Sequence, residues 1–192
     1  MQEIIRLDDD NVILYYPKLI KQNLYKAIMT TTEFGQDRVF VHGQWHTPSR
    51  KTCAFGDNGL TYRYSGMESE SKPYTKVTLA LKEYMERICD CKFNYILAQH
   101  YPDGNSYISP HGDKLIGIKR PVIIASLTIN EGASRDFIIK NKQTGDNITL
   151  TLDDGALIIM KGERIQKEYV HSVPVRKRIT TGRINLTFRQ IE

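Results

Sequence analysis

The sequence has little cysteine and no long hydrophobic run, and these two absences narrow the class of protein. Cys53, Cys89 and Cys91 are an odd number and too few for a disulfide framework, and no CxxC pair occurs. Such a chain is expected to keep reduced thiols and to be intracellular, nuclear or cytoplasmic, rather than secreted. No stretch approaches the roughly 20 apolar residues of a membrane span, so no membrane partner is expected. The opening MQEIIRLDDD lacks the basic and apolar regions of a secretory signal.

The bulk composition is that of an ordinary globular chain with a mild basic excess. The chain has 192 residues, with 40% hydrophobic and 26% charged side chains, which suits one domain with an ample core. No repeat, low-complexity run or Pro/Gly-rich linker divides it. A net charge of +5 and a pI near 9.0 are a weak indication of a polyanionic partner. A monomer is the default expectation.

The hydrophobic pattern changes along the chain, from helical in the first part to strand-like in the second. Residues 17–29 and 74–88 place apolar side chains at helical spacing, and Pro17 suits a first helical position. Residues 38–74 are polar, aromatic and Gly-containing, which predicts short strands and loops. After residue 92, turn signals separate six short β-prone runs, at 93–101, 121–129, 136–140, 147–152, 156–160 and 183–189.

These runs predict a mostly β fold with flanking N-terminal helices (α+β), in the form of a double-stranded β-helix or jelly roll. We expect one domain over residues 1–192. Within it, residues 1–92 would supply the helices and recognition loops, and residues 93–192 the jelly-roll core.

The run RINLTFR at 183–189 is the most informative strand, because side chains alternate between the two faces of a strand. One face is apolar, with Ile184, Leu186 and Phe188. The other face is polar, with Arg183, Asn185, Thr187 and Arg189. Taken alone, this pattern is most simply an apolar face on the core and a polar face in solvent. The run 93–101 is similar, since Gln99 and Tyr101 share a face.

A possible metal site lies in SPHGDKL, where His111 and Asp113 are two residues apart and would share one side of an extended segment. A lone HxD is often only a turn carboxylate beside a histidine. His171, in EYVHSVP, supplies a third ligand type after a further set of strands. Two histidines and one carboxylate form the facial triad of non-haem iron oxygenases, which leaves positions for a 2-oxo acid and O2.

An arginine completes this hypothesis. The far carboxylate of 2-oxoglutarate needs a buried cation, and the planar fork of Arg183 matches a carboxylate with two hydrogen bonds. A zinc hydrolase could use the same three ligands, but it would leave the row of polar side chains around Arg183 unexplained.

Together, HGD, HSVP and RINLTFR resemble the AlkB family of Fe(II)- and 2-oxoglutarate-dependent dioxygenases, and in particular its eukaryotic branch that repairs alkylated bases in double-stranded DNA. Four further segments fit the same family, at 50–66, 93–104, 134–140 and 155–160. The resemblance runs from about residue 38 to residue 192. It is much more specific than HxD alone.

The resemblance implies a role for each matching residue. Iron would be bound by His111, Asp113 and His171. The 5-carboxylate of 2-oxoglutarate would pair with Arg183, and the 1-carboxylate end would be reached by Arg189. Further cofactor contacts would come from Asn185, Tyr101 and Gln99, the last standing where an asparagine is usual.

The resemblance also implies contacts with a flipped base and its duplex. Tyr64 would stack on the base, with Tyr62 and Ser65 in the same substrate loop, which Arg50 and Lys51 begin. Residues 39–46 match a hairpin that wedges into the duplex, with His42 at its tip. The basic run Arg176, Lys177 and Arg178 would hold the opposite strand; without the resemblance it is simply a solvated charged loop.

Two departures concern the substrate. The wedge tip is a phenylalanine in the duplex-repair branch, whereas this sequence has His42. Four residues after the first metal histidine, the family usually has an acid that pairs with the last arginine of the C-terminal motif. Here that position is Leu115, preceded by Lys114, so Arg189 would need an acid from elsewhere.

The resulting hypothesis is an oxidative demethylase. With Fe(II), 2-oxoglutarate and O2 it would remove N-methyl lesions such as 1-methyladenine and 3-methylcytosine from DNA, with a duplex as the expected form, and release formaldehyde, succinate and CO2. One alternative is an RNA or single-strand demethylase, which His42 favours slightly and the 176–178 run disfavours. A non-catalytic nucleic-acid-binding module would be expected to have lost the triad or the arginine row. A protein hydroxylase would not explain the match at 50–66.

Overall fold

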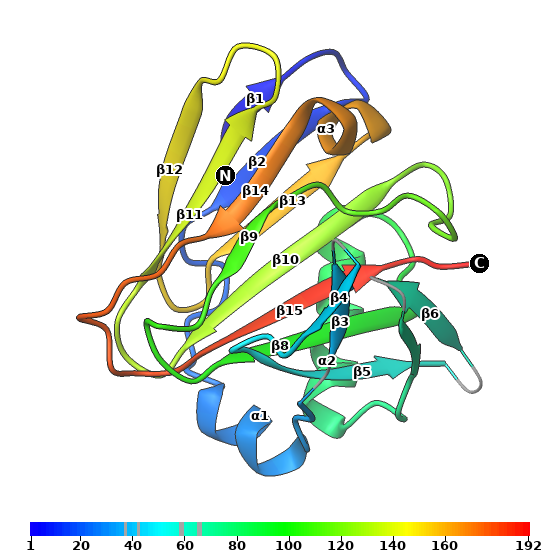
Figure 1. The fold of residues 1–192 in the computed structure, drawn as a ribbon. Coiled ribbons are helices and arrows are strands. Elements are labelled where there is room, and N and C mark those ends of the chain that lie inside the picture. Colours follow the sequence, from blue (N-terminus) through cyan, green and yellow to red (C-terminus); the bar gives the residue numbers. More distant parts are fainter. Residues whose placement is uncertain (37, 42, 58–59, 65–66) are drawn as a thin grey trace.

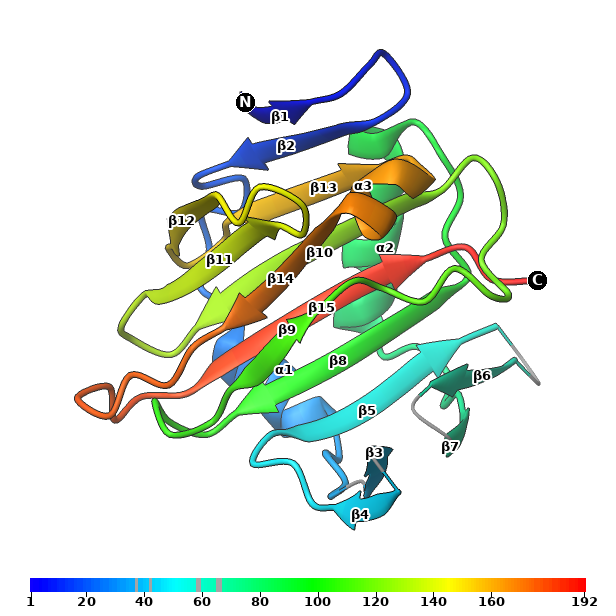
Figure 2. The ribbon, with the colours of Figure 1, turned by 45° about the horizontal axis from the view of Figure 1, so that its top comes forward.

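Two antiparallel sheets face each other in the computed structural model, which describes residues 1–36, 38–41, 43–57, 60–64 and 67–192 (Figures 1 and 2). The large sheet has the order β1 (Gln2–Arg6), β2 (Val12–Tyr16), β13 (Leu157–Lys161), β10 (Ile123–Asn130), β15 (Arg183–Arg189), β8 (Tyr95–Tyr101) and β5 (Lys51–Gly56). The small sheet has the order β12 (Asn147–Leu152), β11 (Arg135–Asn141), β14 (Tyr169–Val173) and β9 (Ile108–His111). This arrangement confirms the predicted mostly β double-stranded β-helix.

Two small hairpins extend from the side of the large sheet that carries β5 (Figure 2). One pairs β3 (Val39–Val41) with β4 (Gln44–His46), and the other pairs β6 (Thr61–Tyr64) with β7 (Met67–Glu70). Both lie in the region 38–74, for which short strands and loops were predicted.

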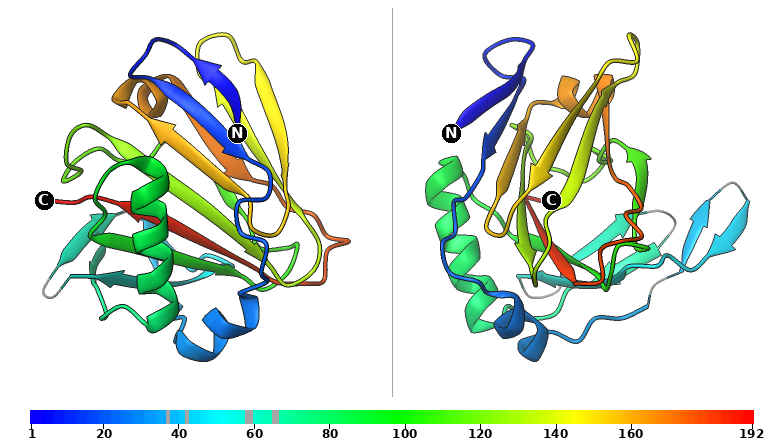
Figure 3. Two further views of the ribbon diagram at one scale, coloured as in Figure 1. Left: turned by 180° about the vertical axis from the view of Figure 1, so that it is seen from behind. Right: turned by 90° about the vertical axis from the view of Figure 1, so that its left-hand side faces the viewer.

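Helices cover the outer face of the large sheet (Figure 3). The longest, α2 (Lys76–Cys89), confirms the helix predicted over 74–88. Thr75 and Thr78 form a capping box at its start, in which each side chain accepts a hydrogen bond from the other residue's backbone N–H. Leu81 and Met85 are buried on its inner face. No helix in the described ranges is long and apolar enough to cross a membrane.

The helix predicted to start at Pro17 is shorter than expected, because α1 spans only Tyr25–Thr31. Tertiary contacts hold the preceding residues out of the helix. The backbone N–H groups of Leu19 and Ile20 both donate to the carbonyl of Gly155, and the Asn23 side chain donates to the carbonyl of Asn130.

Strands β1 and β2 and the short helix α3 (Glu163–Glu168) were not predicted. The large sheet therefore draws strands from both sides of residue 92.

The apolar residues form two layers on either side of the large sheet. One cluster lies between this sheet and the helices, and includes Ile28, Met85 and Leu186. A second lies between the two sheets, and includes Ile124, Phe137 and Ile158. Burial of these side chains against both faces fixes the central strands β10, β15 and β8, and thereby positions the polar side chains that they carry.

Candidate metal centre

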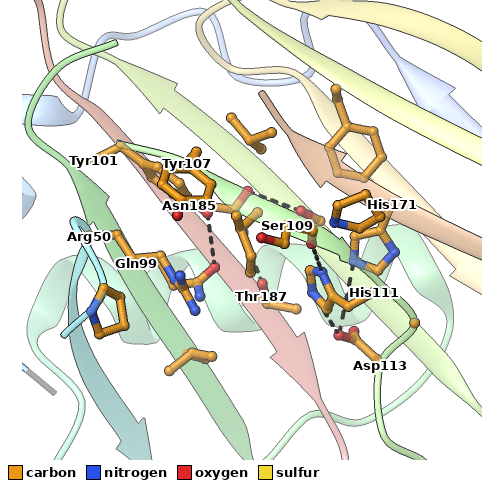
Figure 4. A pocket seen from close by; sticks show the side chains of 18 of the residues that line it. Arg50, Gln99, Tyr101, Tyr107, Ser109, His111, Asp113, His171, Asn185 and Thr187 are labelled. Atoms are coloured by element: carbon orange, nitrogen blue, oxygen red, sulfur yellow. Dashed lines mark hydrogen bonds and ion pairs between the residues drawn. The ribbon is translucent and has the colours of Figure 1, made fainter. Parts of the chain in front are cut away.

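A cavity of about 840 Å³ opens between the two sheets. The strands β8 and β15 form its floor, and β9, β14 and the segment 46–50 form its walls. Figure 4 shows two groups of side chains in this cavity: His111, Asp113 and His171 together on one side, and Arg50, Gln99 and Tyr101 on the other. Its lining therefore includes several polar and charged side chains, although it lies within the core.

The three predicted metal ligands converge. Strands β9 and β14 are neighbours, and their register places His171 directly opposite His111. Asp113 Oδ1 lies 3.9 Å from His111 Nε2 and 4.0 Å from His171 Nε2. One ligand atom from each residue lies within 4.8 Å of the others. Two imidazole nitrogens and a carboxylate oxygen at this spacing suit a divalent transition metal such as Fe(II).

Local contacts orient His111 and Asp113. The carbonyl oxygen of Ser109 lies 2.8 Å from His111 Nδ1. Because a carbonyl can only accept, Nδ1 carries the proton and Nε2 keeps its lone pair for a metal. The backbone N–H of Asp113 donates to Gln166 Oε1 at 2.8 Å. Between the two ligands, Gly112 leaves the space this requires, since a Cβ there would lie 2.4 Å from the carbonyl of Gln166.

The electrostatics keep the ligands in their metal-binding protonation states. Burial alone would raise the pKa of Asp113, but the charges of Arg189, His171 and His111 outweigh it and lower the pKa to about 2. Burial, with His111 nearby, lowers the pKa of His171 to about 4. At neutral pH the site therefore presents an ionised carboxylate and a neutral imidazole.

Arg183 has the properties required for binding a carboxylate. Its side chain is only 1% exposed, and Nη2 donates to Thr128 Oγ1 at 3.0 Å and to Asn185 Oδ1 at 2.8 Å. Two further nitrogens, Nε and Nη1, have no hydrogen-bond partner of standard geometry in the described chain. Burial lowers the pKa of Arg183 to about 10, so it remains charged at neutral pH. A buried cation with two unused donors fits 2-oxoglutarate.

The rest of the polar row on β15 faces the cavity and is buried, so the solvated alternative for this face is wrong. Asn185 accepts a hydrogen bond from Ser126 Oγ and donates to Thr187 Oγ1. On β8, which is paired with β15, the Tyr101 hydroxyl donates to Gln99 Oε1 at 3.4 Å. These contacts fix the orientation of Asn185 and bring Gln99 and Tyr101 to the same floor.

Arg189 has an acidic partner after all. Its Nη2 donates to Asp113 Oδ2 at 3.0 Å, and both side chains are buried. The acid that is missing at Leu115 is thus replaced, for this purpose, by a metal ligand. Leu115 itself is partly buried and packs against the apolar cluster between the sheets.

The residues predicted to bind substrate are more dispersed. Arg50 lines the cavity, whereas Lys51 is exposed at the start of β5 and is not among the lining residues. Arg176 is held by Asp136, with its Nε 2.6 Å from Oδ2. Lys177 and Arg178 are exposed in the connection between β14 and β15. Their contacts with a nucleic acid remain predictions.

The side chains of four predicted substrate residues are not among those that the structure describes. His42 and Ser65 lie outside the described residues. Only the backbone of Tyr62 and Tyr64 is described, as part of β6.

Two residues with clear roles at the site, Gln166 and Ser109, were not predicted from the sequence. Gln166 is buried on α3, and its Nε2 lies 3.4 Å from the sulfur of Met160. Ser109 acts through its backbone carbonyl and Gln166 through its side-chain amide oxygen. The local sequence gives no signal that either group orients a metal ligand.

Fold and site together define the class of an Fe(II)- and 2-oxoglutarate-dependent oxygenase. The family model described as the 2OG-Fe(II) oxygenase superfamily matches residues 13–189. The chain belongs to this superfamily and, by its curated relatives, to the AlkB family within it. The fold alone is also similar to a crystal structure of a Pseudomonas putida prolyl-4-hydroxylase, with a TM-score of 0.60, 15% identity and coverage of 94% of this chain and 93% of that one.

Three curated relatives illustrate the similarity. DNA oxidative demethylase ALKBH2 of Homo sapiens is 34% identical over 162 residues, which cover 80% of this chain and 61% of that protein. The Mus musculus protein of the same name is 36% identical over 165 residues, covering 80% and 66%. Alpha-ketoglutarate-dependent dioxygenase alkB homolog 3 of Bos taurus is 34% identical, covering 74% and 51%. The chain thus spans about three-fifths of the length of the ALKBH2 proteins that it matches.

Proposed function

We propose that this protein is an oxidative demethylase of DNA. With Fe(II), 2-oxoglutarate and O2 it would remove N-methyl groups from bases such as 1-methyladenine and 3-methylcytosine, in duplex DNA by preference, and release formaldehyde, succinate and CO2. The observation that carries this proposal is the cavity that combines the His–Asp–His group with the buried Arg183, whose Nε and Nη1 have no hydrogen-bond partner of standard geometry in the described chain. Its volume of about 840 Å³ is within the usual range for sites that bind small molecules, which leaves room for a flipped base.

The residues would divide the work as follows. His111, Asp113 and His171 would hold Fe(II), which together with 2-oxoglutarate and O2 would supply the oxidant that inserts one oxygen atom into a C–H bond of the methyl group. Arg183 would fix the 5-carboxylate through its two unused nitrogens. The 1-carboxylate end would be near Arg189, and the floor residues Asn185, Tyr101 and Gln99 would supply further hydrogen bonds. The surrounding core would exclude water from the reaction.

The support for a nucleic-acid substrate comes from three sources. Curated relatives are named as DNA oxidative demethylases. The chain has a net charge of +5, and Arg50, Lys177 and Arg178 provide cations at the cavity and on an exposed loop. A base inside a duplex is inaccessible to a cavity between two sheets, so it must be extruded, at a cost of a few kcal/mol. We propose that stacking on Tyr64 and insertion of the 39–46 hairpin offset this cost.

A single-stranded or RNA substrate is the second candidate. It is favoured by His42 at the wedge position, because histidine is smaller than phenylalanine and costs more to dehydrate. A non-catalytic binding module is disfavoured, because both the triad and the polar row on β15 are complete. We further propose that residues 1–192 act as one dioxygenase domain and as a monomer inside the cell.

The test is a demethylation assay with one 1-methyladenine or 3-methylcytosine in duplex DNA, single-stranded DNA and RNA. Fe(II), ascorbate and 2-oxoglutarate are supplied, and the mass of each oligonucleotide is followed. Loss of a methyl group that requires both Fe(II) and 2-oxoglutarate, fastest on duplex DNA, is expected. Faster reaction on RNA or single strands would favour the second candidate. Succinate formed without any demethylation would contradict the removal of these two lesions and leave the oxygenase chemistry standing.

A further inference from the structure

We propose that the cavity selects N-methylated bases that are uncharged over those that carry a positive charge. This inference rests on the proposed function and concerns which bases the site accepts. Methylation at N3 of cytosine or N1 of adenine gives a cation at neutral pH, whereas methylation at N3 of thymine or N1 of guanine gives a neutral base. The second pair would bind and react better.

The charges that line the cavity are the first observation. Within the part of the chain that the structure describes, Asp113 is the only carboxylate among the lining residues. Four cationic side chains line the same cavity: Arg50, Lys114, Arg183 and Arg189. A site that selected cationic bases would be expected to place an acid beside the base.

Asp113 has no capacity left for a cationic base. Its Oδ1 lies about 4 Å from both histidine ligands, and its Oδ2 accepts the hydrogen bond from Arg189 at 3.0 Å. Binding of both cofactors would not change the net charge of the cavity, because the two positive charges of Fe(II) would be offset by the two carboxylates of 2-oxoglutarate. Asp113 and Arg189 likewise offset each other.

The segment that follows the metal ligands is the second observation. Lys114 lines the cavity directly after Asp113, and Leu115 turns away to pack against the apolar cluster between the sheets. This stretch of the wall therefore offers a cation and no acid. On the other side, Arg50 has a buried Nε without a hydrogen-bond partner in the described chain. A neutral base with carbonyl oxygens could accept from such donors, whereas a cationic base would meet repulsion at both ends.

The carbonyl pattern of the neutral lesions agrees with this arrangement. Both 3-methylthymine and 1-methylguanine present a carbonyl oxygen where 3-methylcytosine and 1-methyladenine present an amino or imino group. The lining cations are donors only, so they complement an oxygen and oppose an amino group. Charge and hydrogen bonding thus favour the same pair of bases.

The experiment compares four duplexes that are identical except for the modified base. They form two matched pairs, 3-methylthymine against 3-methylcytosine and 1-methylguanine against 1-methyladenine. Dissociation constants are measured without O2, in the presence of Fe(II) and 2-oxoglutarate, so that binding is separated from chemistry. Demethylation rates are then measured in air. We expect the neutral member of each pair to bind about tenfold more tightly, because a cationic base would be repelled by the positive side chains that line the cavity.

Two variants at one position separate charge from other differences between the bases. Lys114→Glu is expected to shift the neutral-to-cationic ratio about tenfold toward the cationic bases, and Lys114→Gln to shift it part of the way. Because each ratio is taken within one variant, a general loss of activity cancels.

The outcomes are distinguishable. Equal or tighter binding of the cationic bases, with a ratio that neither variant moves, would overturn this inference while the demethylase function stands. Failure to demethylate any of the four, with succinate still formed, would overturn the proposed function and the inference with it.

Discussion

The floor and the rim of the cavity are built in different ways. The floor strands β8 and β15 pair along their whole length, from Arg183 opposite Tyr101 to Arg189 opposite Tyr95, and every residue of both strands is buried. The rim hairpin β3–β4 pairs only three residues with three, and Trp45 on it is 52% exposed. The residues expected to bind 2-oxoglutarate thus lie on fully buried, fully paired strands, whereas the hairpin expected to contact the nucleic acid is short and exposed.

This difference indicates two kinds of constraint. Metal and cofactor binding require atoms held within a fraction of an ångström, which paired and buried strands provide. A nucleic acid has to be bent, opened and released, and a small hairpin at the edge of the fold can adapt to it. Substitutions in the floor should therefore change cofactor binding and turnover. Substitutions at the rim should change the affinity for nucleic acid.

The largest effect is expected at the metal ligand. Asp113→Ala should abolish iron binding and turnover, because two histidines alone hold Fe(II) weakly. Since the substitution also leaves Arg189 buried without its carboxylate, some loss of stability is expected. Metal binding by anaerobic titration and thermal unfolding separate the two effects.

Two controls accompany this variant. Asp113→Asn keeps the shape but not the charge, and Asp146→Asn changes an exposed carboxylate in the β11–β12 turn. Normal turnover in Asp113→Ala would contradict the metal assignment, and loss of turnover in Asp146→Asn would show that the assay reports something other than the site.

The next effect is expected at Arg183. Arg183→Met should raise KM for 2-oxoglutarate about a hundredfold or more, because a buried carboxylate would lose its charge partner. The same variant without cofactor should unfold at an equal or higher temperature, since the wild-type guanidinium is buried with two nitrogens unsatisfied in the described chain.

Steady-state kinetics with varied 2-oxoglutarate and a melting curve test both statements. Arg183→Lys, which retains the charge, should recover part of the affinity. An unchanged KM in Arg183→Met would place the cofactor's 5-carboxylate elsewhere.

A smaller effect is expected at Gln166. Gln166→Met removes the acceptor for the Asp113 N–H while it preserves most of the volume. Iron affinity should fall about 10- to 100-fold, as is typical when the groups that orient a metal ligand are lost.

The control is Gln143→Met, an exposed glutamine in the β11–β12 turn. Fe(II) titration of the folded protein is the decisive measurement. A lower melting temperature with unchanged iron affinity would mean that Gln166 supports only the fold.

The smallest effect is expected at the exposed cations. Lys177→Gln combined with Arg178→Gln should weaken duplex binding about tenfold, and the slope of log affinity against log salt should become shallower by about two. KM for 2-oxoglutarate should not change, because neither residue lines the cavity.

Lys21→Gln combined with Lys26→Gln removes two exposed cations near α1 and serves as the matched control. If both double variants weakened binding equally, the contribution would be net charge alone, and the assignment of residues 176–178 to the opposite strand would fail.

Local periodicity and residue type were sufficient to predict part of the fold and part of the site. Alternation in 183–189 set the two faces of β15, helical spacing set α2, and the short β-prone runs predicted the class of fold. The residue types at 111, 113 and 171 indicated a metal site, because two histidines and one carboxylate form the facial triad of non-haem iron oxygenases, although zinc can use the same ligand types. Family resemblance then extended these observations to Arg183 and the nucleic-acid contacts.

Other features depend on residues far apart in the sequence and are visible only in the folded chain. Pro17 did not begin a helix, because Gly155 and Asn130 bind the segment that follows it. The polar face of β15 was buried rather than solvated, because a second sheet closes over it. Arg189 found its acid in Asp113, and Gln166 became part of the metal site, through single hydrogen bonds between residues far apart in the chain. Local sequence cannot specify such pairs, since they arise only when packing brings the strands together.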